Sequence, residues 1–553
     1  MRSVRYILPL TLLALSTVVF GQNTRRGDFE AGKNLEIFFN VYRGVNTQYV
    51  DTVDNSKLIE TAAEKMLSSL DPYTEYFNEE EMKEFRVHTT GQYGGVGSLV
   101  RKDGKTDYIR ISEPYRDSPA DRAGLRPGDL IVAIDGVSMQ GVSVDTVSAR
   151  MKGVPGSSFV MTVRDGATGK ERDVEIKRER IKIPAVSYAG FINDSVGYVS
   201  LDSFSDGCAA DVRRYIADMK KSGRLKGLIL DLRGNGGGLL DEAVALTGLF
   251  VPKGTEVVSI RGRMESENDV YKTTNEPIDV DLPLVVMVNS VSASSSEIVA
   301  GALQDLDRAV IYGTRTFGKG LVQSTMSVGY GSYMKITTAK YYIPSGRCIQ
   351  ALDYSHRNED GSVGNIPDSL MKEFRTAAGR TVRDGGGITP DITIKPEYAG
   401  KFALALVAYG YIDDYAVEYY NKHRGIDFDP LTFKMSDDEY ADFCRFIEDK
   451  ELEYTSATQL ELNKLKSVAE KEDYSDKLAP MIAQIEAVVK ADKQRDLALY
   501  KREILEYLES AITANYAYAW GRSHRAVAAD THVAEAAAIV SDKDRIASLL
   551  GGE

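Results

Sequence analysis

Residues 284–323 combine a cluster of serines with a lysine between two glycines, which are residue types suited to acyl transfer. The apolar run 284–288 predicts a buried strand, and residues 297–303 predict a helix that starts just after the serines. The free backbone N–H groups of a helix start favour developing negative charge. Glycines beside Lys319 let the backbone bring its amine close to another group. We therefore interpret the segment as a serine nucleophile activated by a lysine base.

Two other interpretations of these residues are open at this level. Ser294 and Glu297 have the spacing of a capping box, which most serines at helix starts serve without catalysis. Gly313 to Lys319 also fits most of the phosphate-binding pattern G-x-x-x-x-G-K-[ST], but Gly320 stands where the last hydroxyl belongs. A phosphate-binding loop opens a helix, whereas residues 321–343 alternate like strands, so the nucleotide interpretation is the weaker one.

Three blocks of the same segment, S-A-S-S-S-E-I, A-L-Q-D and T-F-G-K-G-x-V-Q, occur in this order. Together they resemble the active-site blocks of the C-terminal processing peptidases, also called tail-specific proteases, which use a Ser/Lys dyad. The resemblance implies that Ser294 is the nucleophile, Lys319 the base and Gln323 the residue that orients the lysine amine. It gives Asp305 a catalytic-support role. The family usually has an alanine where this chain has Ser295.

A glycine-rich turn, residues 233–238, follows the apolar run 227–232 and precedes a predicted helix. Consecutive glycines let backbone N–H groups approach a ligand closely, but the G-x-G-x-x-G spacing of a dinucleotide site is absent. In the peptidases that this chain resembles, the block borders the active site. The resemblance implies that Gly237 or Gly238 supplies one oxyanion donor and Ser295 the other, in a crotonase-like core of repeated β-β-α units.

Residues 91–179 consist of short predicted strands, glycine turns and one brief helix, and their S-P-A, A-G-L and G-D-x-I blocks resemble a PDZ domain. A PDZ domain binds a peptide C-terminus by adding it as a strand to a sheet edge. The resemblance implies that Gly95, Val96 and Gly97 form the loop that holds the terminal carboxylate. The expected ligand is a protein or peptide with a free C-terminus and apolar last residues.

The chain of 553 residues is too long for one hydrophobic core, and we expect an α/β multidomain protein. The predicted parts are a signal peptide (1–21), an N-terminal helical module (22–90), the PDZ domain (91–179), the protease core (180–400) and a C-terminal helical domain (401–553). Two arginines, an apolar run and small residues before residue 22 are typical of a secretory signal, and an uncleaved anchor is the alternative. We expect an exported protein of the periplasm or cell envelope.

The charge and the few cysteines exclude other classes. A net charge of -13 argues against nucleic-acid binding, and three widely spaced cysteines form neither a disulfide framework nor a zinc pattern. The C-terminal helices are candidates for homo-oligomer or adaptor contacts. No histidine lies between His88 and His356, so a Ser-His-Asp triad is not expected in the core, and neither a metal nor another cofactor is expected.

A lysine acts as base only when neutral, so its pKa of about 10.4 must fall by ~3 units, which burial can achieve. Two other functions remain possible from the residues alone. One is a catalytically inactive scaffold that keeps a PDZ domain. The other is a crotonase-like acyl-CoA enzyme, which would give no reason for the signal peptide or for the F-G-K-G block.

Overall fold

The computed structural model describes residues 29–357, 362–395, 400–489 and 492–551, and the predicted signal peptide lies outside them. The chain divides into two compact units, one of residues 1–82 and 323–337 and the other of residues 83–322 and 338–553. Within the described ranges, no helix is both long and apolar enough to cross a membrane.

The first unit holds the N-terminal helices and part of a β-ribbon. Its elements are a helix over residues 29–48, α2 (Asn55–Ser68), β1 (Glu75–Phe77), the start of α3 (Glu79–Thr90) and the outer parts of β17 (Leu321–Gly329) and β18 (Ser332–Tyr342). Strand β1 pairs antiparallel with β18, with Tyr76 opposite Met334. This strand interrupts the predicted helical module because the Asp71 carboxylate accepts the Thr74 N–H at 2.8 Å and fixes a turn.

The predicted PDZ domain in the second unit is a sheet in the order β3-β4-β5-β7-β8 with β6 on β5. Its strands are β3 (Ser98–Lys102), β4 (Ile109–Pro114), β5 (Leu130–Ile134), β6 (Val137–Ser138), β7 (Ser158–Arg164) and β8 (Glu171–Lys177). Helices α4 (Pro119–Arg122) and α5 (Val144–Met151) complete it, and β2 (Gln92–Gly95) pairs with β9 (Glu179–Lys182) at its base. Strand β3 lies at the end of the sheet order, next to β4 alone.

The predicted protease core is built on a six-stranded sheet in the order β10-β11-β12-β15-β16-β23. The strands are β10 (Val186–Phe191), β11 (Val196–Leu201), β12 (Gly227–Asp231), β15 (Leu284–Val288), β16 (Val310–Gly313) and β23 (Ile392–Thr393). All neighbours from β11 to β23 are parallel, and only β10 is antiparallel to its partner. Strands β12 and β15 are buried along their whole length, which explains their continuous apolar runs.

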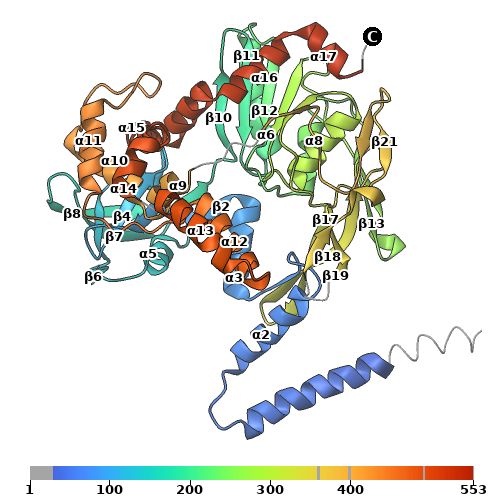
Figure 1. The fold of residues 1–553 in the computed structure, drawn as a ribbon, viewed down its shortest axis with the longest axis horizontal. Helices are drawn as coiled ribbons and strands as arrows, with labels where there is room; N and C mark the ends of the chain where they lie inside the picture. The colour runs from blue at the N-terminus through green and yellow to red at the C-terminus, as the bar shows by residue number, and fades with distance from the viewer. Residues whose placement is uncertain (1–28, 358–361, 396–399, 490–491, 552–553) are drawn as a thin grey trace, which may run out of the picture. The chain divides into compact units, whose positions relative to one another are not determined.

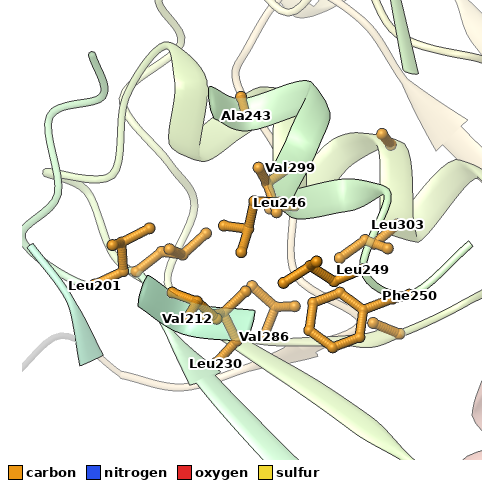
Figure 2. Close-up of a cluster of buried hydrophobic side chains, with 14 of the residues drawn as sticks. Leu201, Val212, Leu230, Ala243, Leu246, Leu249, Phe250, Val286, Val299 and Leu303 are labelled. Atoms are coloured by element: carbon orange, nitrogen blue, oxygen red, sulfur yellow. The ribbon is translucent and has the colours of Figure 1, made fainter. Parts of the chain in front are cut away.

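Helices cover both faces of this sheet (Figure 1). Helices α6 (Cys208–Lys221), α7 (Leu240–Thr247) and α8 (Ser295–Asp305) pack on one face, where Val212, Leu246 and Val299 meet Leu230 and Val286 of the strands (Figure 2). The second face is covered from the far end of the chain: Val533, Ala537 and Val540 of α16 (Thr531–Ser541) contact strand residues such as Ile229 and Met287. The fold therefore places the start of α8 at the carboxyl end of β15.

A second, mostly antiparallel layer and a group of short hairpins flank the core. They comprise β13 (Glu256–Gly262), η1 (Glu265–Glu267), β14 (Asp269–Lys272), β19 (Leu352–Arg357), β20 (Val363–Asn365), η2 (Asp368–Leu370), β21 (Glu373–Arg375) and β22 (Thr381–Arg383). Strand β13 pairs with the inner half of β18, with Ile260 opposite Tyr341. Among the short strands, β19 pairs antiparallel with β20, and β21 pairs antiparallel with β22.

The C-terminal helices form a further apolar cluster and contact the PDZ domain. They are α9 (Lys401–Ala408), α10 (Tyr411–Lys422), α11 (Asp437–Phe446), α12 (Ala457–Lys471), α13 (Ser475–Val489), α14 (Lys493–Leu499), α15 (Lys501–Ala529), α16 and α17 (Lys543–Leu549). A buried ion pair of 2.7 Å joins Arg110 of β4 to Asp414 of α10. Lys105 pairs with Glu418 and Arg424 with Asp165, so the helices hold the PDZ domain by charged contacts.

Candidate active site

Ser294 occupies a strained position between β15 and α8. It is the N-cap of α8 and has φ 56° and ψ -116°, a conformation that side chains other than glycine rarely adopt. Such strain costs ~1–3 kcal/mol and persists only where the surrounding contacts compensate for it. Strained residues of this kind cluster at functional sites. The backbone geometry therefore distinguishes Ser294 from the other serines of the segment.

The neighbouring serines have structural partners. Three hydroxyls donate to backbone carbonyls of the turn after β12: Ser292 to Leu232 at 2.8 Å, Ser295 to Gly238 at 2.9 Å and Ser296 to Asn235 at 2.9 Å. These three side chains are buried, whereas Ser294 is half-buried. The hydroxyl of Ser295 thus joins the start of α8 to the glycine turn.

One carboxylate connects the predicted nucleophile and the predicted base. Oε2 of Glu297 accepts the backbone N–H groups of Ser294 and Lys319, each at 2.9 Å. Oε1 accepts the Thr316 hydroxyl at 2.6 Å and the Gly318 N–H at 2.8 Å. Glu297 is fully buried, and burial raises its pKa to about 7, although these four hydrogen bonds oppose the rise. Its spacing from Ser294 indicated a capping box, but the bonds to residues 316–319 had no signal in the sequence.

The hydroxyl of Tyr341 joins the same two residues from the other side. It donates to the carbonyl of Lys319 and lies 3.3 Å from the carbonyl of Ser294. Tyr341 is buried on β18, in the half of that strand that pairs with β13. The backbones of Ser294 and Lys319 are therefore held together at both their N–H groups and their carbonyls. Lys319 itself is half-buried.

The two predicted supporting residues, Gln323 and Asp305, lie on β17 and α8. Gln323 is on β17, where its Nε2 donates to the Thr337 hydroxyl at 3.2 Å. Asp305 is the last residue of the 11-residue helix α8, so it is about 16 Å along the helix from Ser294. Its carboxylate accepts Arg347 at 2.8 Å. The roles of Gln323 and Asp305 in catalysis remain predictions.

The glycine turn lies directly against the nucleophile position. A Cβ added at Gly237, which has φ 102°, would be 2.8 Å from the Cβ of Ser294 and 3.0 Å from the amide nitrogen of Ser295. A Cβ at Gly238 would be 2.4 Å from the carbonyl oxygen of Phe204. Only glycine fits at either position. The amide of Gly237 donates to Oδ1 of Asn235 at 2.8 Å.

A charged cluster stands at the start of this turn. Asp231, at the end of β12, accepts the Tyr198 hydroxyl at 2.7 Å and both the Nε and Nη2 of Arg233. Burial disfavours the charge of Arg233, but Asp231 and Asp530 together raise its pKa above the usual value. Burial and the Asp231 charge likewise raise the pKa of Tyr198. Arg233 therefore stays charged and Tyr198 stays neutral near pH 7.

The predicted carboxylate loop of the PDZ domain joins β2 to β3. Val96 is buried, and the carbonyl of Gly97 accepts the Ser118 hydroxyl at 2.8 Å. Gly97 has φ 74°, and a Cβ there would be 2.5 Å from the Cβ of Ser118. A Cβ at Gly95 would be 2.6 Å from the Tyr93 ring. Both glycines are thus needed for the local packing, whatever the loop binds.

Known families match four parts of the chain. Residues 195–355 match peptidase family S41, residues 110–165 a PDZ domain, residues 402–540 the C-terminal helical domain of a probable PDZ-protease, and residues 17–81 the N-terminal domain of the activating protease CtpB. The fold and these matches define a serine-type protease with a PDZ domain.

Two curated relatives narrow this class. The carboxy-terminal-processing protease of Bartonella bacilliformis is 38% identical over 378 residues, which are 67% of this chain and 83% of the relative. A probable CtpA-like serine protease of Staphylococcus aureus is 37% identical over 319 residues, 57% of this chain and 62% of that protein. The chain belongs to the family of the carboxy-terminal-processing proteases.

Two solved structures are similar to parts of this chain. The photosystem II D1 C-terminal processing protease is 29% identical, with a TM-score of 0.34, over 65% of this chain and 92% of its own. The PDZ domain of a carboxy-terminal protease from Vibrio cholerae, solved in complex with a peptide, is 28% identical with a TM-score of 0.15 and covers 16% of this chain and 98% of its own.

Proposed function

We propose that the chain is a serine endopeptidase that binds free, apolar C-terminal tails of exported proteins through its PDZ domain and cleaves them with a Ser294/Lys319 dyad. The observation that carries the dyad is the buried Glu297, whose carboxylate accepts the N–H groups of both residues. A single rigid acceptor fixes the separation of their backbones, as a nucleophile and its base require. The strained backbone of Ser294 and its partial exposure support its choice as nucleophile.

In this mechanism the neutral amine of Lys319 takes the proton of the Ser294 hydroxyl while the oxygen attacks the peptide carbonyl. The N–H of Ser295 and that of Gly237 or Gly238 stabilise the oxyanion, which is consistent with the close approach of this turn to Ser294. The amine half of the substrate leaves with the lysine proton, and water then hydrolyses the acyl-enzyme. Gln323 orients the lysine amine, and Asp305 supports the far end of α8 through Arg347.

Recognition of the tail would use the edge strand of the PDZ sheet. Strand β3 is at the end of the sheet order, so an extended peptide can add to it by main-chain hydrogen bonds. The loop of Gly95, Val96 and Gly97 directly precedes this strand and would hold the terminal carboxylate. Helix α5 contacts strand β3, and its Val147 and Met151 belong to the apolar core of the domain, so we expect the substrate's last residues to be apolar.

Replacement of the nucleophile tests the proposal. Ser294→Ala should abolish cleavage of an apolar-tailed peptide and labelling by a fluorophosphonate. Ser290→Ala, an exposed serine in the same turn, is the matched control and should keep both activities. Cleavage that survives in Ser294→Ala would refute the assignment. A folded wild type that neither cleaves nor labels would instead favour the inactive scaffold.

A further inference from the structure

Asp530 has two separate partners, one in its own helix and one in the protease core. It is the N-cap of α16, and its Oδ1 accepts the N–H groups of His532 at 2.8 Å and Val533 at 3.3 Å. Its Oδ2 accepts Nη2 of Arg233 at 2.7 Å, across 297 positions of sequence. The helix cap uses one carboxylate oxygen and the contact with Arg233 uses the other, so both interactions exist at the same time.

The position of Asp530 is fixed by the packing of its helix. Val533, Ala536 and Val540 of α16 are buried against the sheet that carries the active site. The capping bonds set the orientation of the carboxylate relative to the helix. A long flexible side chain on the surface would lose much of the gain from such a pair to conformational entropy. The short, capped side chain of Asp530 avoids this loss because it is already ordered.

Arg233 passes this constraint to the glycine turn. Its Nε and Nη2 contact the buried Asp231, so the guanidinium lies between two carboxylates. The next residue, Gly234, donates its N–H to Oδ1 of Asn289 at 3.0 Å. The carbonyl of Asn235 then accepts the Ala293 N–H at 3.1 Å and the Ser296 hydroxyl. The two residues that flank the Ser294–Ser295 pair are thus bonded to the turn that Arg233 begins.

We propose that Asp530 is a positioning residue of the active site, contributed by the C-terminal helices, which holds Arg233 and through it the turn of Gly237 and Gly238. The inference rests on the proposed function, in which one of these two glycines donates to the oxyanion. An oxyanion donor acts only where its N–H meets the oxygen of the transition state, so a small displacement of the turn lowers kcat more than substrate binding. Asp530 touches no substrate in this scheme.

Asp530→Asn separates the two functions of the residue. Asparagine caps a helix about as well as aspartate, so α16 keeps its start, whereas the charge that faces Arg233 is lost. We expect kcat for an apolar-tailed peptide to fall about tenfold, with KM within twofold of wild type and the same binding of the tail peptide. The rate of fluorophosphonate labelling of the folded variant should fall in parallel, because it needs the same donors.

Asp542→Asn is the matched control. Asp542 is the N-cap of α17 and accepts the Arg545 N–H at 3.0 Å, so the substitution removes the same charge from a cap in the same region. This control should leave kcat unchanged, and the melting temperatures of the two variants should agree. Asp530→Ser, which also keeps a capping oxygen without charge, serves if Asp530→Asn does not fold.

Three results would overturn the proposal. The first is a kcat of Asp530→Asn, and of Asp530→Ser, within twofold of wild type. The second is an equal loss of kcat in Asp542→Asn, which would assign the effect to the net charge of the region. The third is a loss of affinity for the tail peptide that accounts for the whole defect. If folded wild type cleaves no peptide, the proposed function fails first and this inference fails with it.

Discussion

The Glu297 carboxylate accepts four hydrogen bonds, two on each oxygen. Glu297→Gln replaces one of these oxygens by an NH2 group and keeps the shape of the side chain. An ionised carboxylate only accepts, whereas an amide has one oxygen and one NH2 group that must donate. If the NH2 takes the place of Oε2, the N–H groups of Ser294 and Lys319 both lose their acceptor. If it takes the place of Oε1, the Thr316 hydroxyl can turn to accept, but the Gly318 N–H is left unpaired. The second arrangement costs less and should prevail.

The size of the effect follows from this count. A buried N–H without an acceptor costs ~1–3 kcal/mol, and the remaining bonds lose the strength that a charged acceptor gives. If the backbone at Lys319 shifts to relieve that cost, Lys319 is displaced relative to Ser294. Each 1.4 kcal/mol of transition-state stabilisation that is lost lowers the rate about tenfold. We expect Glu297→Gln to lower kcat by about ten- to hundredfold while KM for the peptide changes little.

The pH dependence of activity and of stability tests the role of Glu297 independently. Burial raises the pKa of Glu297 to about 7 from 4.5, and a protonated carboxyl must donate, which displaces one of the four donors. Wild-type activity should therefore fall as pH drops through about 7. Stability should change in the opposite sense. Between pH 4.5 and about 7 the native state binds more protons than the unfolded state, so the free energy of unfolding falls by about 3 kcal/mol as pH rises through this window.

The assay is kcat for one peptide from pH 5 to 9, with thermal unfolding measured at each pH. In wild type both Glu297 and Lys319 must lose a proton, and Glu297→Gln should leave only the lysine ionisation in the acid limb. Thr316→Val is the control, because it removes one donor that lowers the pKa of Glu297 and should move the acid limb to higher pH. A Glu297→Gln variant with the wild-type kcat and pH profile would refute the reasoning.

Two further predictions concern the base and the tail. Lys319→Arg should lose cleavage, because arginine keeps its charge near neutrality and cannot take a proton. Hydrolysis of the same peptide at pH 8 to 10 measures this loss. A variant that keeps most of the wild-type rate would give the lysine an electrostatic role. An amidated apolar tail should be cleaved roughly tenfold more slowly than the free acid, since the cap removes charge-assisted bonds of ~1.5–3 kcal/mol to the loop of Gly95, Val96 and Gly97. The ratio of kcat/KM for the two peptides is the test, and equal values would mean that the PDZ domain binds something else.

Periodicity and composition were sufficient to predict the elements that carry the site. The apolar run 284–288 coincides with β15. The helix predicted at 297–303 is α8, which begins at Ser295 and ends at Asp305. The extra residues at its ends are two serines, a glutamine and an aspartate. Serine and aspartate side chains hydrogen-bond to the nearby backbone, which hides helical character in a sequence pattern. Element type is thus a local property, and the ends depend on the neighbours.

The contacts that organise the site could not be predicted in the same way. The spacing of Ser294 and Glu297 predicts a capping box, and half of that prediction is seen as the bond from the Ser294 N–H. The Lys319 N–H donates to Glu297 across 22 positions of sequence, so this bond depends on how β15, α8 and β16 pack together. Asp530 had no signal at all, because a capping aspartate looks alike whether or not a distant arginine shares it.

One long helix, α15, contacts both the PDZ domain and the protease sheet. Tyr518 interrupts it with φ 58° and ψ -177°, and the freed N–H of Ala519 donates to Glu113 of β4 at 2.7 Å. Beyond the break, the ring of His524 stacks on Tyr188 of β10 with centroids 4.8 Å apart. A non-glycine residue in this conformation costs ~1–3 kcal/mol, so the contacts on both sides of the break must outweigh that cost.

The C-terminal helices are therefore part of the protease rather than an appendage to it. Strand β4 carries Glu113 opposite Leu99 of β3, the strand to which a peptide would add, and α16, which follows α15, brings Asp530 to Arg233. A chain without these helices would keep Ser294 and Lys319. It would expose the apolar face of its central sheet, where α16 buries strand residues, and it would lose the contacts that hold the PDZ domain. The same segment thus supports both the binding module and the catalytic turn.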